Sequence, residues 1–364
     1  MPLNHKPRRV QIIVPARNEQ DSIGRCLESL VSQKGVEFAI TVVDDGSTDR
    51  TRAIAGSFAD VTVIGSSEPV GGTTGKCNAL MAAVEHEASK LEKTRPEWLL
   101  FTDADTFHYP GSLAAALAEA EDRGVDLLSY SPEQEAITWG ERALMPVVFA
   151  ELARAYPPER INDPADRMAV ANGQYILVRR RAYEAVGGHA AVCGCVLEDV
   201  ELARRFKDAG HRIWFRQGTG LVKTRMYRSF SAMVEGWTKN LALLFPNPAG
   251  LALLRLLEFQ VIAALPVAGV AIAHSHPFKA LALLGPALFF YIKFMMRIRK
   301  AEFPWKTNLR AIFGLPFFAF LLLRSYFHSS VRGAVHWKGR TYTHSAPPAM
   351  VDSSIWKGNP PFKG

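Results

Sequence analysis

The stretch WLLFTDAD, residues 98–105, joins an unbroken apolar run to a pair of aspartates. Such a run is typical of a strand that is buried on both faces, and the polar residues mark where the strand ends. Two similar runs that end in polar residues occur earlier in the chain, VQIIVPAR at 10–17 and FAITVVDD at 38–45, and the second of them also ends in two aspartates. Together these stretches predict an open, mainly parallel sheet whose ligands bind beyond the carboxyl ends of its strands.

Apolar residues at helical spacing separate these strands. The spacing predicts helices at 23–31, 48–58 and 76–88, with a short strand at 61–64. Further along, we expect strands at 125–130, 175–178 and 212–215 and a helix at 197–208. The alternation of strands and helices predicts the α/β class.

Carboxylates gather in pairs at the ends of predicted strands or at the start of a predicted helix. The pairs are Asp44 with Asp45, Asp103 with Asp105, and Glu198 with Asp199. Neighbouring like charges are unfavourable unless a cation or hydrogen-bond donors relieve them, and hard oxygen ligands suit Mg²⁺ or Mn²⁺. Strand alternation is expected to point Asp103 and Asp105 to one side. Each pair taken alone is also compatible with an ordinary Asx-turn or helix start.

Two further positions have a functional and an ordinary interpretation. Lys76 follows the glycine-containing loop 71–75 and is placed to reach a phosphate, but the loop lacks the full P-loop pattern. It is equally compatible with a surface lysine. Asn172 precedes the strand at 175–178, where it faces an acceptor or forms a turn.

Five motifs then occur in an order that is specific when they are taken together. They are VPARNE at 14–19, VVDDGS at 42–47, GKCNAL at 75–80, FTDADT at 101–106 and Glu-Asp at 198–199. In this order the sequence strongly resembles the family 2 glycosyltransferases over residues 10 to 240. The resemblance implies a GT-A fold, which is a Rossmann-like domain that binds a nucleotide-diphosphate sugar. Segments 225–228, 236–240 and 337–342 most resemble the membrane enzymes of hopanoid or carotenoid-type lipid biosynthesis.

The resemblance also implies roles for single residues. Asp105 would bind the Mg²⁺ or Mn²⁺ ion, Asp103 would hold the ribose side, and Lys76 would approach the base or diphosphate. Asp199 would be the catalytic base with Glu198 in support. The nucleotide pocket would be lined by Pro15, Arg17, Glu19, Asp44 and Asp45.

The sequence departs from the family pattern after residue 220. Arg228 and Trp237 lie about where processive relatives carry Gln-x-x-Arg-Trp, and that motif is absent. The roles of Arg228, Trp237 and Lys239 therefore stay open, with contact to the acceptor as one possibility. The departure argues against a polymerase and favours transfer of a single sugar, with the inversion of configuration that is general in the family.

The C-terminal third of the chain is strongly apolar. Residues 256–273 and 278–296 are long enough to cross a membrane with help from their flanks, whereas 309–323 is marginal. The loop at 297–310 is basic and is expected on the cytoplasmic side of the inner (cell) membrane, together with the catalytic domain. We therefore expect a catalytic domain at 1–240, a membrane region at 241–330 with two spans and one re-entrant or interfacial segment, and a basic tail at 331–364. The alternative is that these helices form a buried core.

Charge and cysteine content limit the partners. The net charge of +8 suggests an anionic partner, and the cationic cluster between two apolar segments fits a membrane surface better than nucleic acid, for which the usual signatures are missing. No apolar leader is visible before Val10. The four cysteines are expected to be reduced, because Cys193-Gly-Cys195 is too tight for the usual zinc spacing.

The sequence thus predicts a glycosyltransferase that moves a sugar from a nucleotide-diphosphate donor to a lipid or lipid-linked acceptor. One alternative is a sugar nucleotidylyltransferase, which the turn Ala-Arg-Asn-Glu at 16–19 disfavours because that class needs a glycine-rich turn there. The other is a catalytically silent membrane scaffold, against which the intact aspartate pairs count.

Overall fold

The computed structural model describes residues 9–68, 73–89, 95–329, 334–337 and 340–343. The chain divides into two compact units. Residues 1–135 and 156–226 form the first unit, and residues 136–155 and 227–364 form the second. Two segments of the predicted domain 1–240, residues 136–155 and 227–240, belong to the second unit.

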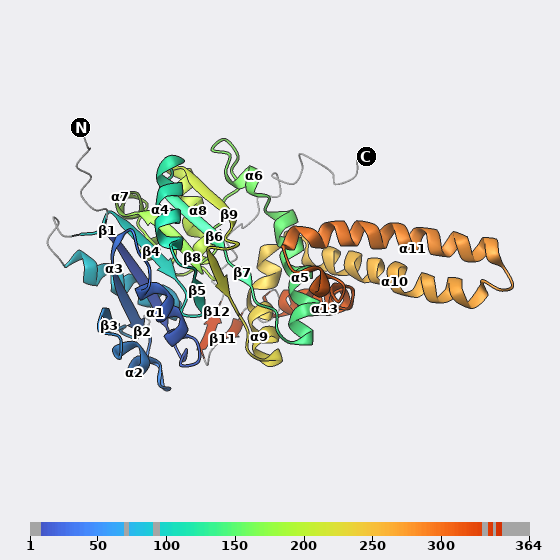
Figure 1. Ribbon diagram of the computed structural model, residues 1–364, viewed down its shortest axis with the longest axis horizontal. Coiled ribbons are helices and arrows are strands. Elements are labelled where there is room, and N and C mark those ends of the chain that lie inside the picture. The colour runs from blue at the N-terminus through green and yellow to red at the C-terminus, as the bar shows by residue number, and fades with distance from the viewer. Residues whose placement is uncertain (1–8, 69–72, 90–94, 330–333, 338–339, 344–364) are drawn as a thin grey trace. The chain divides into compact units, whose positions relative to one another are not determined.

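The first unit is built on a seven-stranded sheet with the strand order β3-β2-β1-β4-β8-β6-β9 (Figure 1). The strands are β1 (Arg9–Ala16), β2 (Glu37–Asp44), β3 (Val61–Gly65), β4 (Trp98–Thr102), β6 (Leu127–Ser131), β8 (Tyr175–Arg179) and β9 (Ile213–Gln217). Strands β3, β2, β1 and β4 are parallel, as are β6 and β9. Strand β8 runs antiparallel to both β4 and β6. The mainly parallel sheet predicted from the sequence is confirmed, with one reversed strand in it.

Helices cover both faces of this sheet because its strands are apolar on both sides. Val10, Ile12 and Val14 of β1 belong to a core cluster with α1 and α4, whereas Ile13 belongs to a second cluster with α3 and α8. The helices of the unit are α1 (Ile23–Val31), α2 (Thr51–Gly56), α3 (Gly75–Ala88), α4 (Ser112–Asp122), α6 (Pro158–Ile161), α7 (Arg180–Ala185) and α8 (Glu198–Asp208). A small second sheet joins β5 (Thr106–His108), β10 (Val222–Thr224) and β7 (Glu133–Gln134).

One helix is shorter than the sequence predicts. Helix α2 begins at Thr51, whereas the pattern predicts a helix from residue 48. The difference arises from local side-chain hydrogen bonds, since Ser47 N–H donates to Asp44 and Thr51 N–H donates to Asp49. Residues 45–50 are therefore a turn at the end of β2, which leaves Asp45 at the edge of the sheet.

The second unit is mainly helical. Its helices are α5 (Trp139–Ala155), α9 (Phe230–Asn240), α10 (Pro248–Ile272), α11 (Pro277–Ile298), α12 (Trp305–Asn308) and α13 (Gly314–Phe327), and strand β11 (Ala334–Trp337) pairs with β12 (Arg340–Thr343). Helices α10 and α11 run side by side as a long helical hairpin (Figure 1). Apart from these two strands, the expected tail at 331–364 lies outside the described residues.

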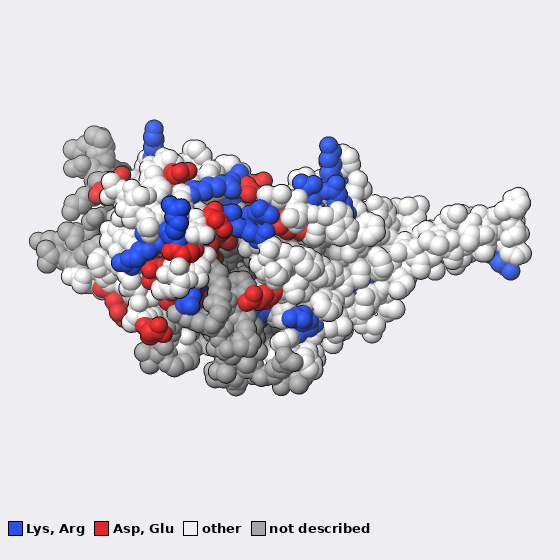
Figure 2. Space-filling view, turned by 90° about the horizontal axis from the view of Figure 1, so that it is seen from below, with Lys and Arg blue, Asp and Glu red and all other residues white. Residues whose placement is uncertain are grey.

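Two helices of this unit are long and apolar enough to cross a membrane: Pro248–Ile272 and Pro277–Ala301. Only 28% of the apolar window of the first and 17% of that of the second are buried within the protein. On the face seen in Figure 2, the hairpin carries almost no charged side chains. The third apolar segment forms the shorter helix Ala311–Phe327. Helices with so little burial are unlike the core helices of a soluble protein.

Three charged residues of the hairpin, Arg255, Glu258 and Arg297, belong to a buried ring of ion pairs with Glu151 of α5, whereas Lys279 and Lys293 are exposed. Arg297 Nε and Arg255 Nε lie 3.0 Å and 3.3 Å from the same oxygen, Oε1 of Glu151 on α5. Both arginines also contact Glu258, with Arg297 Nη2 lying 2.6 Å from its Oε2. Glu151 is fully buried, and Arg255 and Glu258 are nearly so. Two arginines and two buried glutamates therefore neutralise one another where α5, α10 and α11 meet, and the more exposed Arg154 also lies 3.3 Å from Glu151 Oε2.

Candidate active site

The parallel strands bring three polar loops to one edge of the sheet. Ala16 at the end of β1 pairs with Asp44 at the end of β2, and Ile13 of β1 pairs with Phe101 near the end of β4. The loops that follow are 17–19, 45–47 and 103–105. The edge predicted to hold the ligand therefore exists.

Arg17 and Asp45 contact each other across this edge. Arg17 Nη1 lies 3.6 Å from Asp45 Oδ2 and donates a hydrogen bond of 3.3 Å to the Asp45 carbonyl. Ser66, directly after β3, donates to the other carboxylate oxygen of Asp45 at 3.0 Å. The ends of three neighbouring strands thus meet at the carboxylate of Asp45.

The neighbouring aspartate has different partners. Asp44 accepts a hydrogen bond from Ser47 N–H at 3.3 Å and lies 3.6 Å from Arg52 of α2. The carboxylate of Asp44 therefore stabilises a turn, which is the ordinary explanation that the sequence analysis kept open for this pair. Glu19 accepts a hydrogen bond of 2.7 Å from Ser22, directly before α1.

Lys76 links the end of β4 to the start of α8. Its Nζ lies 2.7 Å from Asp103 Oδ1 and 3.7 Å from Glu198 Oε1. Burial acts to lower the pKa of Lys76, but the charges of Asp103 and Glu198 outweigh it and hold the pKa above its usual range. Thr74 places the lysine by capping α3, where its hydroxyl accepts a hydrogen bond from Cys77 N–H. Lys76 is therefore a fixed cation between carboxylates and not an ordinary surface lysine.

Asp199 is the best-placed proton acceptor near this lysine. Gly173 N–H donates to its Oδ2 at 2.8 Å, and Val200 N–H donates to its Oδ1 at 2.9 Å. Burial, followed by the charge of Glu198, raises the pKa of Asp199 to about 6, although Lys76 and the two N–H groups oppose the rise. A carboxylate with a pKa just below neutral pH is suited to act as a general base.

These groups line one small pocket. Lys76 and Asp103 line it together with Gly173, Glu198 and Asp199, and further lining residues are Pro15, Leu80, Phe101, Thr102, Ile176 and His189. Its empty space, counted out to solvent, is about 240 Å³. Five of the predicted site residues therefore lie around it: Pro15, Lys76, Asp103, Glu198 and Asp199.

The sequence analysis did not identify Gly173 and His189 as site residues. A Cβ atom on Gly173 would lie 2.8 Å from Lys76 Nζ and 3.3 Å from Asp199 Oδ2, so a side chain here would displace the Lys76 ammonium group. Burial, with a smaller contribution from Lys76, lowers the pKa of His189 to about 3, so this ring is neutral. The Asn-Gly-Gln turn at 172–174 was a signal for Gly173, whereas nothing in the local sequence marks His189.

Asn172 was expected either to face an acceptor or to form a turn, and in the structure it forms a turn. Its side-chain Oδ1 accepts a hydrogen bond of 3.0 Å from Gln174 N–H. This Asx-turn presents the Gly173 amide to Asp199. The side chain of Asn172 thus shapes the site through the backbone that follows it.

The Asp103-Ala104-Asp105 segment is a turn and not the end of a strand. Thr106 N–H donates to the Asp103 carbonyl at 3.1 Å, and β4 ends at Thr102. The expectation that Asp103 and Asp105 alternate along a strand is therefore wrong. The two aspartates still differ from the residue between them, because Ala104 is buried in the core while both aspartates are partly exposed.

Arg228, Trp237 and Lys239 all belong to the second unit. Trp237 is buried, with its ring 6.2 Å from that of Phe149 and 6.0 Å from that of Tyr227. Arg228 is exposed and Lys239 is partly exposed. The packing of Trp237 accounts for its place in the fold without a ligand.

The side chains at the edge of the sheet fit a hard divalent cation. Asp103 and Asp105 offer only oxygen ligands, and one carboxylate oxygen of Asp105 is buried. Across the described residues, no three His, Cys, Asp or Glu side chains are placed to hold a metal by themselves. Mg²⁺ that is bound with substrate phosphates needs one or two protein carboxylates, so the pair is sufficient.

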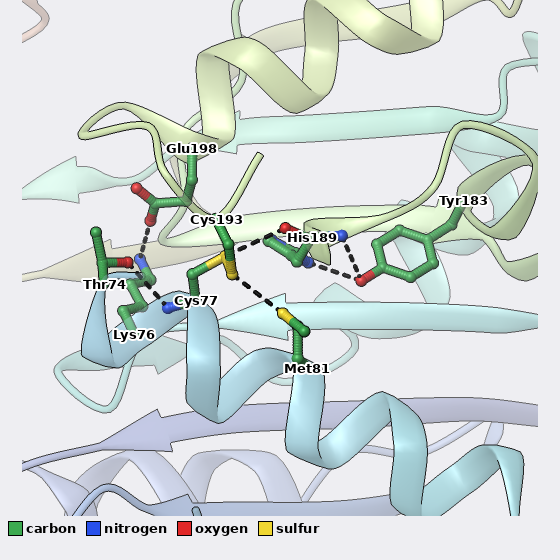
Figure 3. Close-up of a disulfide and its surroundings, with 8 residues drawn as sticks. All are labelled: Thr74, Lys76, Cys77, Met81, Tyr183, His189, Cys193 and Glu198. Carbon is green, nitrogen blue, oxygen red and sulfur yellow. Dashed lines mark hydrogen bonds and ion pairs between the residues drawn. A yellow bond between two sulfur atoms is a disulfide. The ribbon is translucent and has the colours of Figure 1, made fainter. Parts of the chain in front are cut away.

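Two of the cysteines are not reduced, contrary to the expectation from the sequence. Cys77 and Cys193 form a disulfide whose Cα atoms are 5.4 Å apart, whereas Cys26 and Cys195 are free (Figure 3). The two bonded residues are 116 positions apart in the sequence, so spacing gave no sign of the bond. Figure 3 shows the bond beside Lys76 and Glu198.

Comparison with known proteins identifies the class of this site. Residues 11–187 match the model of the family described as Glycosyl transferase family 2. The chain is 27% identical over 361 residues to a 4,4'-diaponeurosporenoate glycosyltransferase of Staphylococcus aureus strain MRSA252, covering 94% of this chain and 90% of that protein. The protein of the same name from strain USA300 is 26% identical over 355 residues, with the same coverage.

The fold has a counterpart among solved structures. A mannosyltransferase from Pyrobaculum calidifontis, solved with GDP-Man and Mn²⁺, aligns with a TM-score of 0.52 over 91% of both chains at 18% identity. This likeness confirms the GT-A fold of the α/β unit. Residues 11–187 therefore carry a domain that matches the family 2 glycosyltransferases, and 94% of the chain is similar to proteins named as glycosyltransferases.

Proposed function

We propose that this enzyme transfers one sugar from a nucleotide-diphosphate sugar to a hydroxyl or carboxyl oxygen of a lipid-like acceptor at the cytoplasmic face of the cell membrane. The observation that carries the proposal is the arrangement of Asp199, Lys76 and Asp103 around one pocket at the carboxyl edge of the sheet. It supplies a base, a cation for the diphosphate and a carboxylate for the donor.

In this proposal the parallel half of the sheet binds the nucleotide. Pro15 and the pair Arg17–Asp45 line the nucleotide side, with Glu19 close by, and Asp45 is favoured over Asp44 because the latter is engaged with Arg52. Asp103 holds the ribose side, and Lys76 turns from it towards the diphosphate. A Mg²⁺ or Mn²⁺ ion held by Asp105 would neutralise charge on the leaving diphosphate.

Asp199 then acts as the base. Its carboxylate removes the proton from an acceptor hydroxyl as the oxygen attacks the sugar carbon and the bond to the diphosphate breaks. An acceptor that is already a carboxylate needs no such removal. One displacement without an enzyme nucleophile inverts the configuration. Gly173 N–H fixes the orientation of the base, and burial together with the charge of Glu198 raises its pKa to about 6.

The class of acceptor is proposed from the relatives and from the apolar hairpin. The two Staphylococcus aureus relatives are named as glycosyltransferases of 4,4'-diaponeurosporenoate, which suggests a carotenoid-like or other lipid-like acceptor. The low burial of α10 and α11 supports two membrane spans, and the ion-pair ring neutralises three of their charges, those of Arg255, Glu258 and Arg297. The shorter helix 311–327 is proposed to lie at the membrane interface.

We expect Asp105→Ala to weaken donor binding in the presence of Mn²⁺ by tenfold or more and to abolish transfer, because the diphosphate loses the cation that neutralises it. The measurement is thermal stabilisation of the purified chain by a panel of nucleotide sugars, with and without Mn²⁺, followed by mass analysis of glycosylated lipids. Asp122→Asn, which changes an exposed aspartate at the end of α4, is the control. Equal stabilisation of the Asp105→Ala variant and the unaltered chain would remove Asp105 from the metal site.

The rate should fall at acid pH. Asp199 must be ionised to accept a proton from an acceptor hydroxyl, so protonation below its pKa of about 6 removes the base. We expect kcat/KM with such an acceptor to be level above about pH 7 and to fall about tenfold per pH unit below pH 6. A decline that begins only near pH 4, as for an exposed aspartate, would contradict the assignment.

A further inference from the structure

A disulfide joins two walls of the pocket described above. Cys77 lies in the first turn of α3, directly after Lys76, and Cys193 lies five residues before Glu198 (Figure 3). The Thr74 N–H also donates to the Cys193 carbonyl at 3.2 Å across the same contact. The bond therefore connects the segment that carries the pocket lysine to the segment that carries the base.

The pocket between these walls is narrow. Its empty space is about 240 Å³ even when the part open to solvent is counted. Lys76 Nζ contributes to the closure, since it lies close to both Asp103 and Glu198. In the proposed function the nucleotide lies beside Arg17 and Asp45, outside this pocket, and the diphosphate and sugar enter beside Lys76, so the disulfide limits how far the walls part around them.

The surroundings of both sulfur atoms suit a reduced state as well. Cys77 Sγ lies 3.3 Å from the His189 carbonyl, which can accept a hydrogen bond from a thiol, and Cys193 Sγ lies 3.1 Å from Met81 Sδ. Both cysteines are buried, so a reductant reaches the bond only when the two segments open locally. Two thiol sulfurs in contact lie about 1.5 Å further apart than two bonded ones, so reduction separates the walls.

We propose that Cys77 and Cys193 form a thiol–disulfide switch that sets the opening of the donor pocket, closed when oxidised and open when reduced. The proposal rests on the proposed function for the identity of the donor. It also reconciles a disulfide with a catalytic domain on the cytoplasmic side, where lasting disulfides are rare and those that form are mostly regulatory or catalytic.

The exchange needs a dithiol as reductant. One of its thiolates attacks Cys193 Sγ, the bond between the two protein sulfurs breaks, and Cys77 leaves as a thiolate that takes up a proton. The second thiol of the reductant then attacks the mixed disulfide and releases Cys193. The protein gains two thiols, and the dithiol is oxidised to its own disulfide.

The test compares the full chain in detergent after oxidation with oxidised glutathione and after reduction with dithiothreitol. Alkylation under denaturing conditions should label two cysteines in the oxidised form and four in the reduced form. We expect the KM for the donor to be about tenfold or more higher in the oxidised form, with a smaller change in kcat. The double variant Cys77→Ser with Cys193→Ser should match the reduced chain in both states, and Cys195→Ser should keep the response.

A second readout needs no substrate. Backbone hydrogen exchange in residues 73–80 and 192–199 should be faster in the reduced chain and in the double variant than in the oxidised chain. Equal KM values and equal exchange in the two states would overturn the switch. A redox difference in exchange without transfer from any nucleotide sugar, in either state, would instead contradict the proposed function.

Discussion

Asp199→Asn should lower turnover by about 10²–10⁴-fold and leave donor binding close to that of the unaltered chain. Asparagine has nearly the same shape as aspartate, and its carbonyl oxygen can still accept the hydrogen bond from Gly173 N–H. It cannot take a proton from an acceptor hydroxyl. The loss therefore falls on kcat, whereas Lys76, Asp103 and Asp105 still bind the donor.

The measurement is the rate of transfer to a hydroxyl acceptor together with nucleotide affinity for both forms of the enzyme. Asp208→Asn is the matched control, because Asp208 is exposed at the other end of the same helix, α8. It should leave both quantities unchanged. Turnover of the Asp199 variant within about threefold of the unaltered enzyme would assign the base to another group, since the loss of a general base is larger.

The second large effect is on stability and concerns the buried ring of ion pairs. Glu151→Gln should destabilise the helical unit by about 3–5 kcal/mol, because it leaves two buried arginines with a single carboxylate. In the structure both arginine Nε groups share Oε1 of Glu151. The amide oxygen of glutamine can accept a hydrogen bond, but it carries no charge to balance Arg255 and Arg297.

Thermal unfolding of the purified chain in detergent measures this effect. Glu235→Gln provides the control, since Glu235 is an exposed glutamate on α9 in the same unit. Its expected change is within about 0.5 kcal/mol. If both variants unfold at the same temperature, the ring does not stabilise the unit, and the charges of α10 must be relieved in another way.

Much of the first unit could be predicted because its signals are local. The strands at 10–15, 38–43 and 98–101 are apolar runs that end in polar residues, and each lies within one residue or two of its observed bounds. Helix α5 was not predicted because its residues are buried around most of its circumference. It therefore has no polar face to reveal the helical spacing of its apolar residues. The reversed direction of β8 also leaves no trace in its own residues, because pairing partners decide it.

The charged residues of the site could be predicted from the sequence, but the contacts between them could not. Asp103, Lys76, Glu198 and Asp199 were named from their motifs, but only the fold brings residue 76 within reach of residue 198. The Asx-turn at Asn172 and the contact of Gly173 with Asp199 depend on packing between segments. Glu258 is an acidic residue within the apolar segment 256–273, and only the structure shows that it lies between two arginines.

The reversal of β8 divides the catalytic sheet into two regions with separate tasks. Because β8 runs antiparallel to β4, it begins at the edge of the sheet where β4 ends. The turn that precedes β8 therefore places the Gly173 N–H against Asp199. In the proposed function, the residues assigned to the nucleotide all precede this point in the chain, and the proposed base, Asp199, follows it. A chimera of two relatives that are joined within residues 103–172 should therefore keep the nucleotide preference of the N-terminal parent. It should take its acceptor preference from the C-terminal parent.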